Sequence, residues 1–262
     1  MKYLIAIFCL LMTLVFSGCS NTCSLPLAVA EMTVVETPKS ETKPVLVELF
    51  TSEGCSSCPP ADRLLFDIST NQTYKDIEVI TLGYHVDYWD NIGWKDRFSS
   101  REYTKRQEAY SRQFRLDSTY TPQIVVDGER EVVGNDRRSV DAAVTKSTDD
   151  KADVRLGLKD DKLSISIEKI REQKGSTVFL AVAESGLRSA VISGENSGRN
   201  LDHASVVREL RSLGKIESGM KMYSNQVNVP TNGEWKAHRL RYVVFVQDDT
   251  TLKIQGVAAI GR

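Results

Sequence analysis

Apolar positions in the first half of the chain follow two patterns that change every ten to twenty residues. Short runs rich in β-branched residues, bounded by turn-forming residues, are typical of buried strands. Apolar residues three and four positions apart indicate one face of a helix. These patterns predict strands over residues 45–50, 77–82, 124–126 and 131–133. They predict helices over residues 59–71, 99–114 and 136–146.

The expected order is therefore strand, helix, strand, helix, strand, strand, helix. Parallel βαβ units followed by an antiparallel hairpin are typical of a thioredoxin-like domain, which we place at residues 44–150. Asp127-Gly128 suits the turn of that hairpin. The first helix begins with Pro59 and Pro60, where a missing N–H group has no cost.

The second half of the chain has a different texture. Residues 163–167 alternate apolar and polar side chains with period two, and residues 177–183 do so more loosely. Further strand-like runs cover residues 239–247 and 252–260. The pattern predicts a small antiparallel, β-sandwich-like domain over residues 151–262. The expected fold class is thus an α/β thioredoxin-like domain followed by an antiparallel β domain.

The N-terminus reads as an export signal over residues 1–18. Lys2 precedes an apolar run too short for a comfortable membrane span, and small residues follow it. The ending F-S-G-C resembles a bacterial lipobox, with Phe16 where leucine is usual, and makes Cys19 the expected lipidation site. An ordinary secretory signal cut nearby is the alternative. Residues 19–43, rich in small polar residues, glutamate and proline, then form a disordered tether.

These features predict a location in the cell envelope, with the chain held to the membrane by an N-terminal lipid anchor. Ser20 favours an outer-membrane lipoprotein facing the periplasm, and a periplasmic or secreted protein is the alternative. The formal net charge is −1, so no overall basic field draws the chain to nucleic acid. No cofactor is expected.

Candidate chemistry centres on two of the five cysteines, Cys55 and Cys58. The C-x-x-C spacing between a strand and a helix lets two sulfurs reach disulfide distance at a helix start, where the helix field favours a thiolate. Cys55 is expected to be the attacking, partly exposed thiol and Cys58 the resolving one. An oxidising compartment favours a resting disulfide. Cys23 is left as an odd thiol.

Thr121-Pro122 precedes the third expected strand, the position where thioredoxin-like domains place a cis-proline opposite the C-x-x-C pair. Pro122 is therefore a candidate catalytic-site residue and Thr121 a candidate substrate contact. A trans proline at a strand start is the alternative.

An aromatic segment follows the second strand. His85, Trp89 and Trp94 are candidates for the wall of a substrate groove, since strand C-termini in such sheets lie near the active edge. His85 is also a candidate proton shuttle. The alternative is that both tryptophans only pack this loop. Further along, Glu195 and Arg199 in a polar loop suit either an ion pair docking the two halves or a ligand contact.

Four segments together resemble an uncharacterised bacterial family of secreted thioredoxin-like proteins, a domain-of-unknown-function family. They contain the C-x-x-C pair, the H-V-D-Y-W-D and G-W-K-D motifs, T-P-Q, and G-E-N-S-G-R-N-L-D-H, and they extend over about residues 45–261. The resemblance implies the fold and the export, and implies no known reaction.

The leading hypothesis is an envelope thiol–disulfide oxidoreductase whose partners are protein or small-molecule thiols and disulfides. A binding or assembly module with a structural Cys55–Cys58 disulfide is the second hypothesis. Handling of a soft metal such as Cu(I) by the thiols is the third. A structural zinc site is not expected, because it needs four ligands and the three histidines are scattered.

Overall fold

A computed structural model describes residues 35–36, 42–171, 175–230 and 232–261. The expected export signal over residues 1–18 and the lipidation site Cys19 lie outside the described residues. The part of the expected tether that is described differs from expectation. β1 (Val35–Glu36) pairs antiparallel with Leu158 and Gly157, because backbone groups at a free sheet edge accept a further short strand. None of the described helices is long and apolar enough to cross a lipid bilayer.

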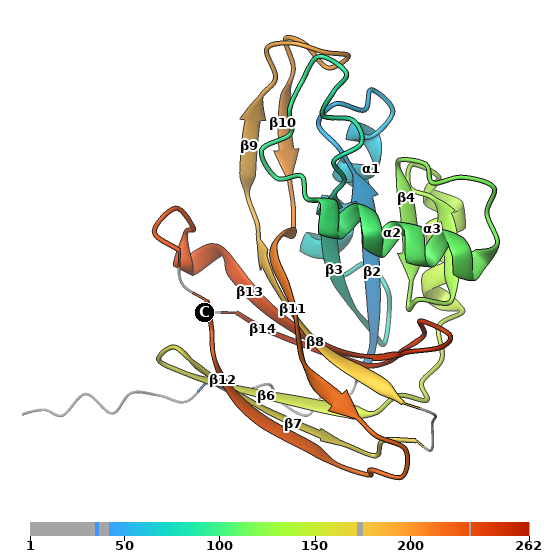
Figure 1. Ribbon diagram of the computed structural model, residues 1–262, viewed down its shortest axis with the longest axis vertical. Helices are drawn as coiled ribbons and strands as arrows, with labels where there is room; N and C mark the ends of the chain where they lie inside the picture. Colours follow the sequence, from blue (N-terminus) through green and yellow to red (C-terminus); the bar gives the residue numbers. More distant parts are fainter. Residues whose placement is uncertain (1–34, 37–41, 172–174, 231, 262) are drawn as a thin grey trace, which may run out of the picture. The chain divides into compact units, whose positions relative to one another are not determined.

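The fold is a mixed α/β arrangement around one large sheet (Figure 1). Its strand order is β14-β13-β8-β11-β3-β2-β4-β5. The bounds of these strands are β2 (Lys43–Thr51), β3 (Ile77–His85), β4 (Gln123–Val126), β5 (Arg130–Val133), β8 (Ser176–Glu184), β11 (Val206–Ile216), β13 (Leu240–Asp248) and β14 (Ile254–Gly261). β3 is parallel to β2 and β11, and the remaining neighbours are antiparallel.

Three helices cover the β2–β5 end of this sheet. They are α1 (Pro59–Asn71), α2 (Arg101–Phe114) and α3 (Arg137–Thr145). α1 and α3 pack on one face over Val45, Val47 and Leu49, while α2 packs on the other over Leu46 and Phe50. Alternate residues of β2 thus enter opposite cores, which explains why the strand reads as a continuous apolar run.

Polar caps set two of the helix starts. The Ser100 side chain accepts a hydrogen bond from the amide of Glu102 at the start of α2. The Asp136 side chain accepts from the amides of Arg138 and Ser139 at the start of α3. Both caps satisfy N–H groups that the helix leaves unpaired. The predicted strands and helices of the first half are confirmed, with ends shifted by up to three residues.

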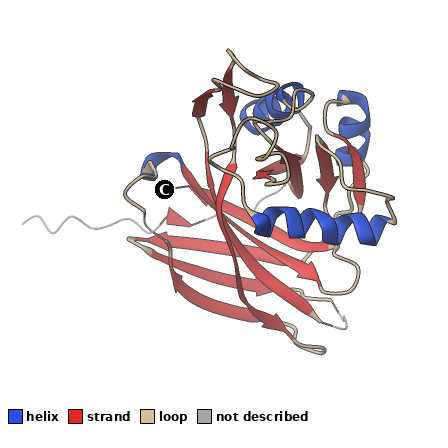
Figure 2. Ribbon diagram, turned by 45° about the horizontal axis from the view of Figure 1, so that its top comes forward, coloured by secondary structure: helices blue, strands red, loops and turns tan. Residues whose placement is uncertain are grey.

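A second sheet packs face to face with the far end of the first (Figure 2). Its order is β1-β6-β7-β12, with β6 (Asp153–Lys159), β7 (Lys162–Glu168) and β12 (Tyr223–Asn228) all antiparallel. Inward residues of β6 and β7 meet those of β8, β13 and β14 in an apolar core. A short hairpin, β9 (Leu187–Ala190) and β10 (Asn200–His203), and a 3₁₀ turn, Ala237–Arg239, complete the chain.

The two halves of the sequence share the central sheet. β11 lies beside β3, where Val206 pairs with Gly83, and the described residues of both halves belong to one compact unit. Gly83 carries no side chain because a Cβ there would lie 3.3 Å from the backbone oxygen of Ala204. The expected boundary near residue 150 therefore does not separate two sheets. The first half lacks a strand on the β3 edge, and β11 supplies it.

Candidate functional site

Cys55 and Cys58 form a disulfide between the C-terminal end of β2 and the start of α1. Their Cα atoms are 5.4 Å apart, and the hydroxyl of Ser57 lies 3.4 Å from the Cys55 sulfur. The strand-to-helix placement expected for the pair is thus observed. The start of α1 is poorer in amides than a usual helix start, since neither Pro59 nor Pro60 has an N–H group. The helix field and the Ser57 hydroxyl remain to stabilise a thiolate there.

Both cysteines are fully buried, so the expectation of a partly exposed Cys55 is wrong for this structure. A loop between β9 and β10 contacts the backbone on both sides of Cys55. Asn196 donates from its side-chain amide to the backbone oxygens of Glu53 and Cys55, at 2.9 Å each. Glu195 accepts a hydrogen bond from the amide of Ser56 at 3.1 Å. The Ser56 side chain and this amide together hold the pKa of the Glu195 carboxyl below its usual value.

We call residues 191–199 the cover loop, because this segment lies over the backbone around the disulfide. Its internal contacts differ from the ion pair considered from sequence. Arg199 donates to the side-chain oxygen of Asn196 and not to Glu195. Glu195 and Asn196 both bind residues 53–56, which we call the disulfide loop. The cover loop therefore docks one half of the chain onto the other.

Thr121-Pro122 is a cis peptide bond just before β4, as the sequence analysis expected. Pro122 lies beside α1. A Cβ built on Gly134 would be 3.1 Å from Pro122 Cβ and 3.2 Å from Ala61 Cβ, so those two side chains flank the same glycine. Thr121 accepts a hydrogen bond from the indole N–H of Trp89 at 2.9 Å.

Both tryptophans contact residues next to the disulfide. Trp89 packs against Gly54, where an added Cβ would lie 3.2 Å from the tryptophan Cβ. Trp94 donates from its indole N–H to a carboxylate oxygen of Glu53 at 2.7 Å. Trp89 therefore connects the disulfide loop to the Thr121-Pro122 turn, and Trp94 fixes the Glu53 side chain.

His85 lies deeper than expected from sequence. It is 1% exposed at the end of β3, and its Nδ1 is 2.6 Å from a carboxylate oxygen of Asp96. Asp96 also accepts hydrogen bonds from the amides of Glu53 and Phe98. Burial opposes ionisation of Asp96, but His85 and these amides hold the pKa of its carboxyl below the usual value.

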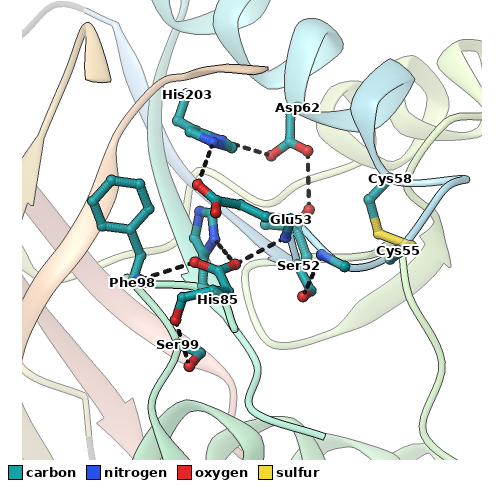
Figure 3. A network of polar contacts seen from close by, with 12 residues as sticks. Ser52, Glu53, Cys55, Cys58, Asp62, His85, Phe98, Ser99 and His203 are labelled. Atoms are coloured by element: carbon teal, nitrogen blue, oxygen red, sulfur yellow. Dashed lines mark hydrogen bonds and ion pairs between the residues drawn. A yellow bond between two sulfur atoms is a disulfide. The ribbon is translucent and has the colours of Figure 1, made fainter. Parts of the chain in front are cut away.

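Figure 3 shows His85 with Glu53, Asp62 and His203 in a buried network next to the disulfide. Asp96 contacts His85, and we call these five residues the histidine–carboxylate cluster: Glu53, Asp62, His85, Asp96 and His203. His203 Nε2 is 3.2 Å from Glu53, and Asp62 accepts a hydrogen bond from Thr51. Burial opposes charging of His203, but Asp62 and Glu53 raise its pKa to about 9. Burial likewise opposes ionisation of Glu53, but the His203 contact and the Trp94 hydrogen bond hold its pKa below the usual value.

Sequence reasoning named only His85 from this cluster. Asp96 and His203 stand inside two of the quoted motifs, and Glu53 and Asp62 flank the C-x-x-C pair, yet a single polar residue in a motif predicts no partner. His203 is 150 residues from Glu53 in the chain, and only the β9–β10 hairpin and the pairing of β11 with β3 bring them together. Asp96 stands between Lys95 and Arg97, so its sequence neighbours predict an exposed carboxylate and give no sign of its burial.

Comparison with known proteins places this geometry in a family. The family described as "Protein of unknown function (DUF1223)" matches residues 46–247. The structure of protein AGR_C_4864 from Agrobacterium tumefaciens, a structural-genomics target, is similar with a TM-score of 0.68 and 26% identity. The similarity covers 86% of this chain and 96% of that one.

A second similar structure is HBP35 of Porphyromonas gingivalis, with a TM-score of 0.52 and 14% identity over 86% of this chain and 76% of that one. At that identity the likeness is one of fold alone. No curated protein matches the chain. Because the family match spans most of the residues from β2 to β13, this chain belongs to the family of proteins of unknown function DUF1223.

Proposed function

We propose that the protein is a thiol–disulfide oxidoreductase of the cell envelope, built on a thioredoxin-like domain at residues 44–150. The observation that carries the proposal is the Cys55–Cys58 disulfide at the start of α1, with the cis Thr121-Pro122 bond beside the same helix. The strand order β3-β2-β4-β5, with α1 and α3 on one face and α2 on the other, supports the thioredoxin-like assignment.

The reaction is a two-electron exchange. In the reduced protein, the Cys55 thiolate attacks a substrate disulfide, forms a mixed disulfide and releases one substrate thiol. Cys58 then attacks the Cys55 sulfur, which releases the second substrate thiol and restores the Cys55–Cys58 bond. The two electrons and two protons pass from the protein dithiol to the substrate, and run the other way when the protein acts as an oxidant.

The cover loop adds a step to this scheme. Both sulfurs are buried, so a substrate reaches Cys55 only after the contacts of Asn196 and Glu195 with the disulfide loop open. The substrates we propose are protein or small-molecule thiols and disulfides of the envelope. The proposed location is the outer membrane, with lipidated Cys19 as the anchor, in keeping with the N-terminal sequence.

One observation favours a second function. Complete burial of Cys55 and Cys58 is typical of a structural disulfide, in which case the protein is a binding or assembly module. The two functions differ in one measurable quantity, the reduction potential of the bond. Structural disulfides in exported proteins lie below about −300 mV, whereas exchange-active ones lie above that value.

The test is to equilibrate the protein in dithiol–disulfide buffers of known potential, and to assay reduction of an added protein disulfide. We expect a potential above about −300 mV and loss of activity in Cys55→Ser and Cys58→Ser. Cys23→Ser is the matched control and keeps wild-type activity. A potential well below that value, together with unchanged activity in Cys55→Ser, contradicts the oxidoreductase and supports the structural role.

A further inference from the structure

The histidine–carboxylate cluster carries more buried negative charge than its partners neutralise. Glu53 and Asp96 are 0% and 1% exposed, and Asp62 is 8% exposed. In the described part of the chain, these three carboxylates pair with His85 and His203, and with no lysine or arginine. Buried carboxylates are costly unless a cation or several hydrogen bonds balance them.

We propose that Asp62, His85 and His203 bind one divalent transition-metal ion of the Zn²⁺ type beneath the disulfide. One ligand atom from each of the three residues lies within 4.8 Å of the others, and all three residues are buried. A bound ion draws such atoms inward to about 2.0–2.2 Å from the metal, so a small side-chain shift closes the site. The ligands come from the consecutive elements α1 and β3 and from β10, which is far from both in sequence.

Each histidine already has the partner that metal-binding imidazoles usually have. Asp96 holds Nδ1 of His85 at 2.6 Å, and Glu53 holds Nε2 of His203 at 3.2 Å. A carboxylate on one ring nitrogen fixes the ring and leaves the other nitrogen for the metal. In His203 the other nitrogen, Nδ1, is buried without a hydrogen bond and lies 3.9 Å from Asp62 Oδ1.

An access path reaches the ligands from outside. A pocket of about 330 Å³ lies between α1 and the β9–β10 hairpin, and Asp62 and His203 are in its wall. Phe66 and Leu201 line the same pocket, so its sides are partly apolar. Three protein ligands together with an open side facing a pocket are the arrangement in which a metal keeps one position for water or another small ligand.

The ligand set also selects the class of ion. Two imidazoles and one carboxylate suit Zn²⁺, Co²⁺ or Ni²⁺, whereas Mg²⁺ and Ca²⁺ require oxygen ligands and Cu⁺ prefers sulfur. The Cys55 and Cys58 sulfurs are bonded to each other and take no part. The proposal therefore stands apart from the redox function and does not depend on it.

The test titrates the full chain without an affinity tag, with the Cys55–Cys58 bond oxidised and the free thiols alkylated. Zn²⁺ is measured by competition with a chromophoric chelator, and Co²⁺ by its visible absorption. We expect one ion per chain, and at least about 100-fold weaker binding in Asp62→Asn and His203→Gln. Glu53→Gln and Asp96→Asn should lose about 10–100-fold. The third histidine, exposed His238, supplies the matched control His238→Gln, with unchanged affinity.

Folding of each variant is checked by circular dichroism. If a ligand variant unfolds, the metal affinities of Glu53→Gln and Asp96→Asn test the site in its place. The proposal is overturned if the oxidised wild-type protein takes up no ion. It is also overturned if the variants of the ligands (Asp62→Asn, His203→Gln) and of the carboxylates that hold the histidines (Glu53→Gln, Asp96→Asn) bind the ion as tightly as wild type. It is also overturned if Cys55→Ser/Cys58→Ser abolishes uptake. Persistence of metal binding in that double variant, alongside loss of disulfide chemistry, separates this site from the proposed function.

Discussion

The interior between the two sheets is apolar, whereas the interior next to the disulfide contains charged and polar side chains. Between the sheets, the core contains aliphatic side chains from β6, β7, β8, β13 and β14, with Tyr242 among them. Next to the disulfide, the buried groups are carboxylates and imidazoles joined by hydrogen bonds of 2.6 to 3.2 Å. Apolar burial gives stability without direction, whereas buried charges stabilise only in one geometry. The comparison implies that the apolar core between the sheets, which we call the sheet core, supplies most of the stability, and that the charged interior supplies the groups able to do chemistry.

The largest expected effect comes from removing volume between the sheets. Leu180 on β8 is fully buried in the sheet core, and Leu180→Ala should lower the free energy of unfolding by about 2–5 kcal/mol. The reduction potential of the Cys55–Cys58 bond should not change, because the cavity is remote from it. Urea denaturation and a redox titration measure the two quantities. Ile192→Ala, at a 79% exposed position, is the control for losing an apolar side chain. A shifted potential in Leu180→Ala would show that the two interiors are coupled.

A smaller effect, on the rate at which the disulfide is reduced, is expected at the cover loop. Asn196→Ala removes two hydrogen bonds to the disulfide loop, worth about 1–2 kcal/mol together. If opening of the loop limits access, reduction of the disulfide by a small dithiol should become faster by a factor of about 5–30. Stopped-flow or quenched alkylation follows that rate. Ser197→Ala in the same loop loses only a contact within the loop and should leave the rate unchanged. Equal rates in wild type and Asn196→Ala would remove the loop from the scheme.

The smallest effect is expected at a partly exposed ion pair in the second half of the chain, between Lys215 and Asp249. Asp249 binds Thr177 and Lys215. Burial opposes its ionisation, but these partners hold its pKa below the usual value. Because the folded pKa lies below the unfolded one, the contact stabilises above the unfolded pKa, and this contribution is lost as pH falls through the folded pKa. Asp249→Asn should cost about 0.2–1 kcal/mol at pH 7, since the pair is partly exposed.

The same variant should match wild type once the pH is below the folded pKa, which denaturation curves across pH will show. The control is Asp160→Asn, at an exposed turn between β6 and β7. A loss that persists unchanged in acid would mean that Asp249 acts through packing and not through its charge.

Most strands and all three helices follow from the sequence, because their side chains alternate or repeat without interruption. β11 does not, and its geometry explains why. The pairing of β11 with β8 shifts register between Val207 and Glu209 and again between Ser212 and Gly214. Each bulge breaks the period-two pattern, so a central strand reads as an irregular charged segment. Without β11 the sequence suggests that each half of the chain forms its own sheet, whereas the large sheet contains strands from both halves.

The disulfide site was predictable and the cluster below it was not, for a related reason. Cys55 and Cys58 at the start of α1, and Pro122 beside that helix, belong to one recurring strand-and-helix unit, so their placement around α1 follows from local order. His203 meets Glu53 only through the hairpin and strand that the irregular pattern conceals. The exposure of Cys55 was wrong for the same reason, since Asn196, which helps cover it, is carried by that hidden part of the chain.

The pairing of β11 with β3 also bears on the tendency of the protein to aggregate. Without residues 151–262, β3 would be an outer strand of a small sheet, with its amides and carbonyls open to any chain that can extend it. Its sequence, I-E-V-I-T-L-G-Y-H, combines β-branched residues with a single acidic side chain and no lysine or proline, so it has few of the features that discourage self-association. β11 pairs with β3 at Gly83, so the second half of the chain closes this part of the edge to further strands.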